Sequence, residues 1–148
     1  MKSALSFAFA LLLAAGAAQA QSAADIIAAR QTGFKNMGAA FGDVKKVLDA
    51  GGDTTTVVAK AQEVADWARK IPAAFPAGSG PESGVKTRAL PAIWTNKGEF
   101  EFLSANAGRE ADKLVAALKS GDKVASLAAF QATGGTCGAC HRPYRAPQ

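Results

Sequence analysis

The chain has 148 residues, of which 49% are hydrophobic and 20% charged, and its formal net charge is +5. This charge is modest and mixed along the sequence, with no cluster of lysine and arginine interleaved with aromatic residues, which argues against nucleic-acid binding. The length suits one domain with a single hydrophobic core.

The N-terminal 20 residues are typical of a secretory signal peptide. Lys2 supplies a positive charge, residues 4–15 are almost wholly apolar, and Ala18-Gln19-Ala20 provides the small side chains of a cleavage site. The apolar stretch is shorter than the roughly 20 residues of a membrane span, which disfavours an uncleaved anchor. We therefore expect cleavage after Ala20, a mature domain of residues 21–148, and a periplasmic location without membrane insertion.

Two amphipathic helices are predicted first in the mature chain, each with inward residues at alternating three- and four-residue steps. Gly51-Gly52 ends the first helix, Asp53 or Thr54 can cap the second, and Pro72 ends it. The predicted inward residues are Ile27, Arg30, Phe34, Met37, Phe41, Val44 and Leu48 in the first helix, and Val57, Ala61, Val64, Ala68 and Ile71 in the second.

A long connection and two more helices follow. Residues 72–95 contain four prolines and three glycines, which predicts an irregular loop with a packing or binding role. A third helix is expected from about residue 98 to residue 119, and Ser120-Gly121-Asp122 makes a short turn that caps a fourth. The predicted inward residues are Phe100, Leu103, Ala107, Leu114 and Leu118 in the third helix, and Val124, Leu127, Gln131, Gly134, Cys137 and His141 in the fourth.

The only two cysteines and the only histidine stand together in the run Cys137-Gly138-Ala139-Cys140-His141. On a helix, residues three and four apart share a face, so both thiols and the imidazole point the same way. This spacing suits a haem whose two vinyl groups are bound as thioethers while the histidine ligates the iron. A zinc site lacks further ligands, a thioredoxin-like pair lacks a following helix, and a plain disulfide leaves the histidine unexplained.

These features together predict an all-α fold, an antiparallel four-helix bundle with covalently bound haem in its core. Helices of about 20 residues are roughly 30 Å long, and the short connections near residues 51 and 121 permit only antiparallel neighbours. The many inward alanines leave room for a flat apolar cofactor, although alanine also favours helix and close packing in its own right.

Further motifs carry a family resemblance. They are Arg30-Gln31 with Phe34, Met37 and Phe41 on one helix face, then Pro91-x-Ile93-Trp94, and finally Cys137-x-x-Cys140-His141-x-x-Tyr144-Arg145. With these motifs the whole mature chain resembles the cytochromes c′, the class II c-type cytochromes. One position departs from the pattern, since Ala92 stands where many members have an acid. The resemblance implies one covalently bound haem c, attached through Cys137 and Cys140, with His141 as the axial ligand of the iron.

The resemblance also implies roles for residues around the haem. Arg30 and Gln31 would approach the propionates, Phe34 would cover the distal face, Arg145 would lie beside the proximal face, and Arg88 is a candidate for the haem edge. The residues by themselves leave alternatives. A guanidinium on an apolar helix face needs an anionic partner, which is either a propionate or an Asp or Glu of a neighbouring helix. Arg145 can equally be an exposed residue at the chain end.

The sixth coordination position of the iron decides between functions. Met37 is the only methionine outside the predicted signal peptide and the one strong candidate for a second protein ligand, but the family places its distal residue at Phe34. We expect a five-coordinate, high-spin iron in an electron carrier that also binds NO and CO. The alternatives are a low-spin electron-transfer cytochrome ligated by Met37, a dedicated NO-binding or NO-scavenging protein, and a purely structural haem protein.

No enzymatic activity is expected, because the chain has no second histidine and no paired carboxylates for acid–base chemistry. The expected partners are an unidentified periplasmic redox protein and a second copy of the chain, since members of the family often form homodimers through their first two helices. Ala39, Ala40 and Val47 are candidates for an exposed seam on those helices.

Overall fold

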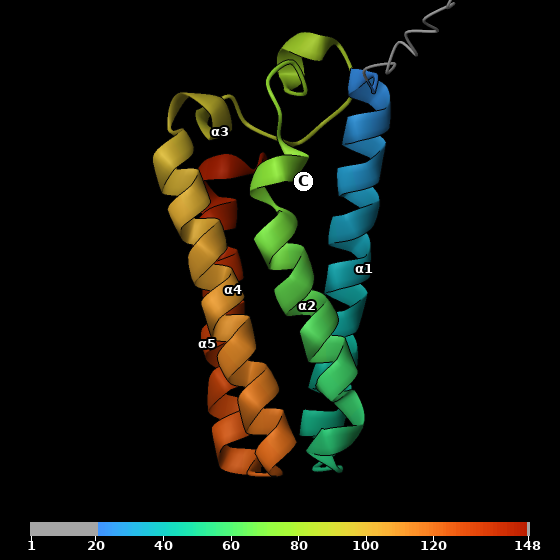
Figure 1. Cartoon of the computed structure of the whole chain (residues 1–148), viewed down its shortest axis with the longest axis vertical. Coiled ribbons are helices and arrows are strands. Elements are labelled where there is room, and N and C mark those ends of the chain that lie inside the picture. The colour runs from blue at the N-terminus through green and yellow to red at the C-terminus, as the bar shows by residue number, and fades with distance from the viewer. Residues whose placement is uncertain (1–20, 148) are drawn as a thin grey trace, which may run out of the picture.

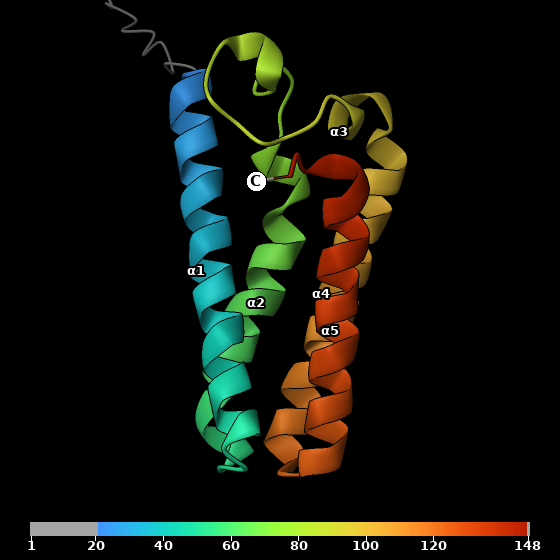
Figure 2. The ribbon, with the colours of Figure 1, turned by 180° about the vertical axis from the view of Figure 1, so that it is seen from behind.

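The structure, a computed structural model, describes residues 21–147. The predicted signal peptide lies outside these residues, so its cleavage stays a prediction. Four long helices run antiparallel to one another, as Figure 1 and Figure 2 show from opposite sides. They are α1 (Ala23–Asp49), α2 (Val58–Lys70), α4 (Lys97–Ser120) and α5 (Lys123–Tyr144), with a short helix α3 (Ala92–Thr95) before α4. The predicted all-α four-helix bundle is confirmed.

Polar side chains cap the starts of three helical segments. The Ser22 side chain accepts from the backbone N–H of Asp25 at 3.1 Å before α1, and Asp122 accepts from two backbone N–H groups at 2.9 Å before α5. Asp53, rather than Thr54, caps the start of the second helical segment, a 3₁₀ turn over Thr54–Val57 that leads into α2. These caps explain why the helix starts could be predicted closely.

Glycines reverse the chain at one end of the bundle. Gly51 and Gly121 have φ values of 62° and 74°, the left-handed region that a side chain with a Cβ rarely enters. Both turns lie at the same end, where α1 passes to α2 and α4 passes to α5 (Figure 1). The short connections predicted near residues 51 and 121 are therefore confirmed.

The long connection crosses the opposite end of the bundle. It contains two 3₁₀ turns, Pro72–Ala74 and Pro81–Ser83, and is otherwise irregular up to α3. The chain end returns to this loop, because the N–H of Leu90 donates to the carbonyl of Tyr144 at 3.0 Å and that of Ala146 donates to the carbonyl of Arg88 at 2.9 Å. None of the helices in the described part of the chain combines the length and apolarity that crossing a membrane requires.

The helices α1 and α5 touch each other least among neighbours in the bundle, while α4 packs extensively on both α2 and α5. Toward the end with the short turns, α1 and α5 are joined by stacked rings of Phe41 and Phe130, whose centroids are 4.2 Å apart. This stack packs against a fully apolar cluster of Val44, Val57, Ala61, Leu114, Val115 and Leu118. This cluster fills the end with the short turns, and a second buried cluster, which includes Ile71, Ile93, Phe100 and Tyr144, lies toward the loop end.

The first half of α5 faces the core differently from the prediction. Val124 and Leu127 are 82% and 46% exposed, and Gln131 is exposed as well. The residues that do face inward are mostly small and polar, namely Ser126, Ala129, Phe130, Thr133 and Thr136. No apolar period marks this face in the sequence, because three of its residues are serine or threonine. The threonine hydroxyls can be buried because they donate within α5, as Thr133 Oγ1 does to the Ala129 carbonyl at 2.8 Å.

The proposed dimer seam on α1 is also corrected in part. Ala40 is 2% exposed and packs with Val64, Ala65 and Ala111, so it belongs to the core. Val47 is half-buried against the apolar cluster, and only Ala39 is exposed. The physical reason is that Ala40 lies beside Phe41 and Val44 on an inward face wider than the single seam inferred from the sequence.

Candidate haem site

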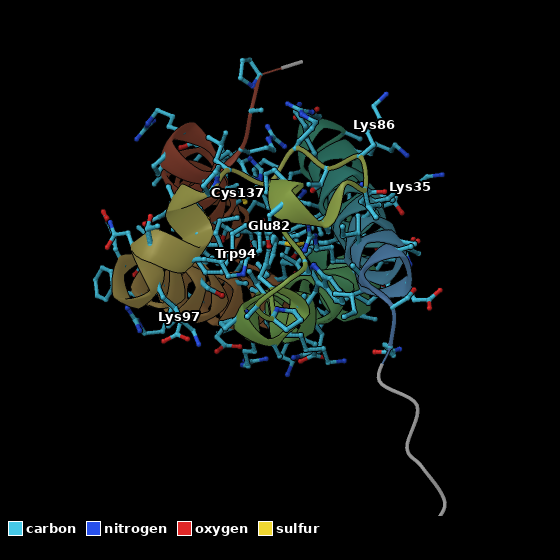
Figure 3. All side chains as sticks on the ribbon, turned by 90° about the horizontal axis from the view of Figure 1, so that it is seen from above. Lys35, Glu82, Lys86, Trp94, Lys97 and Cys137 are labelled. Carbon is cyan, nitrogen blue, oxygen red and sulfur yellow. The ribbon has the colours of Figure 1, made fainter. Side chains whose placement is uncertain are left out.

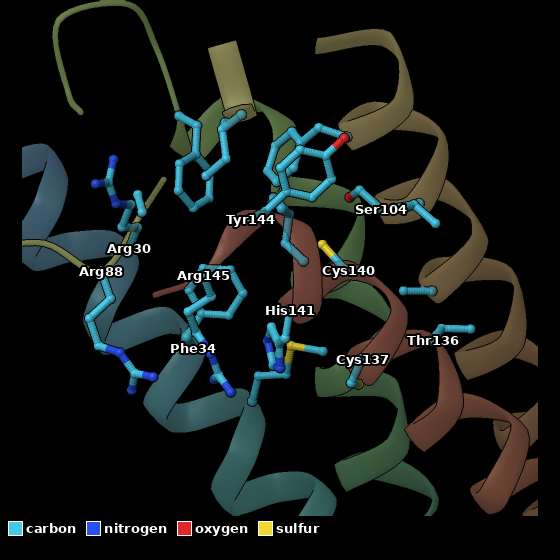
Figure 4. Close-up of a pocket in the computed structure, with 18 of the residues that line it drawn as sticks. Arg30, Phe34, Arg88, Ser104, Thr136, Cys137, Cys140, His141, Tyr144 and Arg145 are labelled. Atoms are coloured by element: carbon cyan, nitrogen blue, oxygen red, sulfur yellow. The ribbon is translucent and has the colours of Figure 1, made fainter. Parts of the chain in front are cut away.

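A cavity of about 600 Å³ is lined by residues of α1, α4, α5 and the long loop (Figure 4). Its volume falls within the range of about 300–1,000 Å³ typical of ligand and cofactor pockets. Most of its lining is apolar, from residues such as Phe34, Ile71, Phe75, Phe100 and Leu103. The cavity reaches the surface between α1 and α5, where Gln31, Gly38 and Arg145 line it and are exposed.

Cys137, Cys140 and His141 all line this cavity from the last turns of α5. Both thiols are half-buried and free, and burial raises the pKa of each of them. The pKa of His141 is lowered, first by burial and then by the positive charges of Arg145 and Arg88. A lowered pKa keeps the imidazole neutral at pH 7, which is the form that binds a metal. The donor set therefore fits a haem bound through two thioethers and one imidazole.

Arg30 reaches into the same cavity from α1 and is only 3% exposed. Its Nη1 donates to Ser79 Oγ and its Nη2 to Thr87 Oγ1, both at 2.9 Å, and the guanidinium lies over the Phe75 ring at 4.5 Å. Burial lowers its pKa, and the charge of Glu82 opposes this effect. Among the described residues, no carboxylate forms an ion pair with it. The alternative of a salt bridge to a neighbouring helix is therefore wrong for the described chain.

A buried guanidinium that donates only to two hydroxyl groups and lies over an aromatic ring retains donors and charge for an anion. The propionates of a haem are carboxylates of the required kind, so this residue also fits the cofactor. Gln31, one position later, is exposed at the cavity mouth, and its Nε2 donates to the Lys86 carbonyl at 3.4 Å. The amide thus ties the loop to α1, a contact that the sequence did not predict.

Phe34 points into the cavity from α1, toward the side on which His141 lies (Figure 4). Its ring is held edge-on by Trp67 at a centroid distance of 5.9 Å and lies 6.1 Å from the Phe75 ring. Trp67 comes this close to α1 because residue 33 is glycine, since a Cβ on Gly33 would overlap the indole. Met37 also lines the cavity, and it packs against the buried cluster of Ala40, Val64, Ala65 and Ala111.

Arg88 and Arg145 stand at the edge of the cavity, near enough for their charges to act on His141. Arg88 Nε and Nη2 donate to the Ala146 carbonyl at 2.9 and 2.6 Å, which fixes the chain end. Arg145 is exposed, and its backbone pairs with Ala89 in an isolated antiparallel bridge. Its side chain is thus exposed, as one alternative had it, while the loop holds the backbone on both sides of Arg145.

Several residues of the site escaped the sequence analysis. Ser79 and Thr87 hold Arg30 from a loop whose hydroxyl residues have no periodic pattern, so no signal marked them. Tyr144, quoted only as part of a motif, is 3% exposed, and its hydroxyl donates to Glu99 Oε2 at 3.2 Å. Phe75 contacts Arg30, Phe34 and Phe100, and a lone aromatic in a proline-rich loop was not recognisable as the wall of a pocket.

Comparison with known proteins agrees with this geometry. A family model described as "Cytochrome C'" matches residues 25–145. A cytochrome c′ of Rhodopseudomonas palustris is 34% identical over 138 residues, which cover 92% of this chain and 90% of that protein.

Solved structures share the fold. The nitric oxide complex of a mutant of cytochrome c prime from Alcaligenes xylosoxidans is 26% identical, with a TM-score of 0.78 over 88% of this chain and all of that one. A cytochrome c′ with ligand-controlled dimer dissociation is 27% identical, with a TM-score of 0.79 over 86% of this chain and 99% of that one. Family model, relatives and fold thus agree with the site, and the chain belongs to the cytochrome c′ family, whose cofactor is covalently attached haem c.

Proposed function

We propose that the protein is a periplasmic electron carrier whose haem iron is five-coordinate and high-spin and binds small gases such as NO and CO. The observation that carries this proposal is that Phe34, which has no lone pair to offer a metal, projects into the cavity from α1. In this proposal Cys137 and Cys140 hold the haem as thioethers and His141 ligates the iron. Haem c supplies an iron that changes oxidation state and keeps one position open for a ligand.

The surrounding residues position and shield this group. Arg30, with its uncommitted positive charge, and Gln31 bind the propionate side. Arg145 lies beside the proximal face, and Arg88 holds the chain end that follows His141. Phe34, held by Trp67 and Phe75, excludes water and larger ligands from the distal side. The Phe34 ring itself offers no hydrogen-bond donor, so the distal side favours uncharged diatomic molecules.

Two other interpretations have an observation in their favour. Met37 lines the cavity, which supports a low-spin electron-transfer cytochrome with Met37 as sixth ligand. Its packing against buried alanines and Val64 supports a structural role instead, as is usual for a methionine on a core face. The nitric oxide complex of the Alcaligenes xylosoxidans relative supports a dedicated NO-binding protein. Catalysis is not part of the proposal, because its cavity has no acid–base pair besides the single histidine.

Location and assembly belong to the same proposal. The N-terminal signal directs export, the signal peptide is removed after Ala20, and residues 21–148 act in the periplasm. We also propose a homodimer that forms through α1 and α2, with the exposed residue Ala39 of α1 in the interface. The relative with ligand-controlled dimer dissociation supports such an assembly.

The absorption spectrum of the reduced holoprotein, recorded with and without CO, tests the coordination. We expect a high-spin ferrous spectrum that changes when CO is added, and the same spin state in Met37→Leu. A low-spin spectrum with a sharp α band and no response to CO would contradict the open site. Conversion of that spectrum to high spin in Met37→Leu would identify the methionine as the ligand.

A further inference from the structure

The segments that meet around the cavity mouth contain no acidic residue. They are residues 26–42 in α1, residues 83–98 from the loop through α3 to the start of α4, and residues 123–148 in α5 and the chain end. All 12 Asp and Glu residues of the chain lie outside these segments. The basic residues of these segments are Arg30, Lys35, Lys86, Arg88, Lys97, Lys123, Arg142 and Arg145. Two acidic residues beside these segments, Glu82 and Glu99, act on the cavity-lining residues Arg30 and Tyr144, but the charged residues of the three segments themselves are all basic.

Four of these cations form what we call the basic rim: Lys35, Lys86, Arg88 and Arg145. Arg88 and Arg145 line the cavity and are seen beside His141 in Figure 4. The bond from Gln31 to the Lys86 carbonyl brings Lys86 against α1, one helical turn from Lys35. Viewed from the loop end, Lys35 and Lys86 lie at one edge of the molecule, and Lys97 lies at the opposite edge (Figure 3). The rim therefore surrounds the side on which the cavity opens.

The rim charges lack partners of opposite sign. The seven ion pairs formed by residues 21–147 all lie elsewhere, and none includes a member of the rim. Six of the seven join residues three or four apart on one helix, and the remaining pair joins Arg69 of α2 to Asp112 of α4. Exposed lysines on other faces, such as Lys45, Lys60 and Lys113, are neutralised in this way. The rim is left with its positive charge.

Bound haem leaves most of this charge in place. Its two propionates bring two negative charges, and the buried Arg30, which is not part of the rim, is the first cation available to them. The four rim cations outnumber the negative charge of the propionates that remains once Arg30 is paired. A positive surface around an opening to the site attracts negatively charged partners and raises their association rate.

We propose that an acidic electron-transfer protein docks on the basic rim, over the opening between α1 and α5. The inference rests on the proposed electron-carrier function and names its partner by charge. In the encounter the reduced partner loses one electron and is oxidised, the cofactor of this chain gains that electron and is reduced, and no bond is made or broken. Such encounters need little buried surface, because a weak, steered and short-lived complex suits a carrier that must release its partner.

The test measures reduction of the oxidised holoprotein by flavodoxin hydroquinone, a small acidic flavoprotein, in a stopped-flow instrument. The Lys35→Gln/Lys86→Gln variant removes two rim charges without touching a residue that lines the cavity. The Lys70→Gln/Lys119→Gln variant is the matched control, since it loses the same net charge from exposed lysines of α2 and α4 that form no ion pair with a described residue. A neutral reductant, lumiflavin semiquinone, reports whether the haem accepts electrons at all.

We expect the second-order rate constant with flavodoxin to fall about five- to tenfold in the rim variant and less than about twofold in the control, at an ionic strength of about 10 mM. This difference should vanish near 0.5 M salt, where the Debye length is only a few ångströms. Equal losses in both variants would overturn the inference, because they would report net charge and not the rim. The inference would also be overturned if the rim substitutions weakened binding to phosphatidylglycerol vesicles but left the rate of reduction by flavodoxin unchanged. Failure of lumiflavin semiquinone to reduce any variant would instead refute the electron-carrier proposal itself.

Discussion

Gly33→Ala tests whether the distal wall of the cavity depends on close packing of Trp67 against α1. A Cβ at this position would overlap the six-membered part of the Trp67 indole, so the ring or the helix must move. Overpacking of this kind costs about 1–3 kcal/mol of unfolding free energy. Alanine also favours helix over glycine by about 0.5–1 kcal/mol, and this gain partly masks the cost of the clash.

Gly42→Ala removes the ambiguity because Gly42 is also inside α1 and a Cβ there meets no atom within 4 Å. The gain in helix propensity is common to both variants, so the difference between them isolates the clash. We expect Gly33→Ala to be less stable than Gly42→Ala by about 1–3 kcal/mol. For a domain of this size, that corresponds to a melting temperature lower by about 4–12 °C.

The assay is urea and thermal unfolding of the holoproteins, repeated in a Trp67→Phe background. The smaller phenyl ring lacks the atoms that the Cβ would meet, so the cost of Gly33→Ala should shrink there by about 1–2 kcal/mol, as a double-mutant cycle measures. Equal stability of Gly33→Ala and Gly42→Ala would refute the argument. An undiminished cost in the Trp67→Phe background would show that the destabilisation has another origin.

Two further predictions concern the cavity and its proximal wall. Phe34→Ala should raise the association rate of CO by about tenfold, because the ring no longer has to move aside. This change is equivalent to removing about 1.4 kcal/mol from the barrier. An unchanged association rate in flash photolysis would mean that the ring is not the barrier. Burial and the charge of Glu99 raise the pKa of Tyr144, so its contribution to stability is complete below the unfolded pKa near 10 and is lost as the pH rises through the folded value. Tyr144→Phe should therefore make the unfolding free energy less dependent on pH above about 10. The variant should also be about 0.5–1.5 kcal/mol less stable at pH 7, because it loses the hydrogen bond to Glu99. If denaturant titrations at alkaline pH showed the same slope of unfolding free energy against pH in both proteins, the assignment to Tyr144 would be contradicted.

The helices were predictable because their boundaries depend on local chemistry. Asp53 and Asp122 cap, Gly51 and Gly121 reverse the chain, and Pro72 ends α2, and each of these effects acts within a few residues. The haem motif was predictable for the same reason, since a helix brings Cys137, Cys140 and His141 to one face whatever the rest of the chain does.

The contacts between distant segments were not predictable. The bonds from Arg30 to Ser79 and Thr87 span 49 and 57 positions, and nothing in the loop sequence marks those hydroxyls. The inward face of α5 was mistaken because hydrophobic periodicity finds apolar residues only, whereas this face uses threonine and serine in their place. The same limit hid the contact between Gly33 and Trp67, in which the informative feature is an absent side chain.

The cavity exists because α1 and α5 are separated at the loop end, and three contacts fix this separation. On the side of the short turns, the Phe41–Phe130 stack joins the two helices and ends the cavity. At the other end, the loop binds α1 through Arg30 and binds the end of α5 through Arg88 and Ala146, so it spans the separation without closing it. A regular helix in place of residues 72–91 would have no reason to bond to both sides. The irregularity of this segment is therefore what allows a four-helix bundle to keep one side open for a flat cofactor.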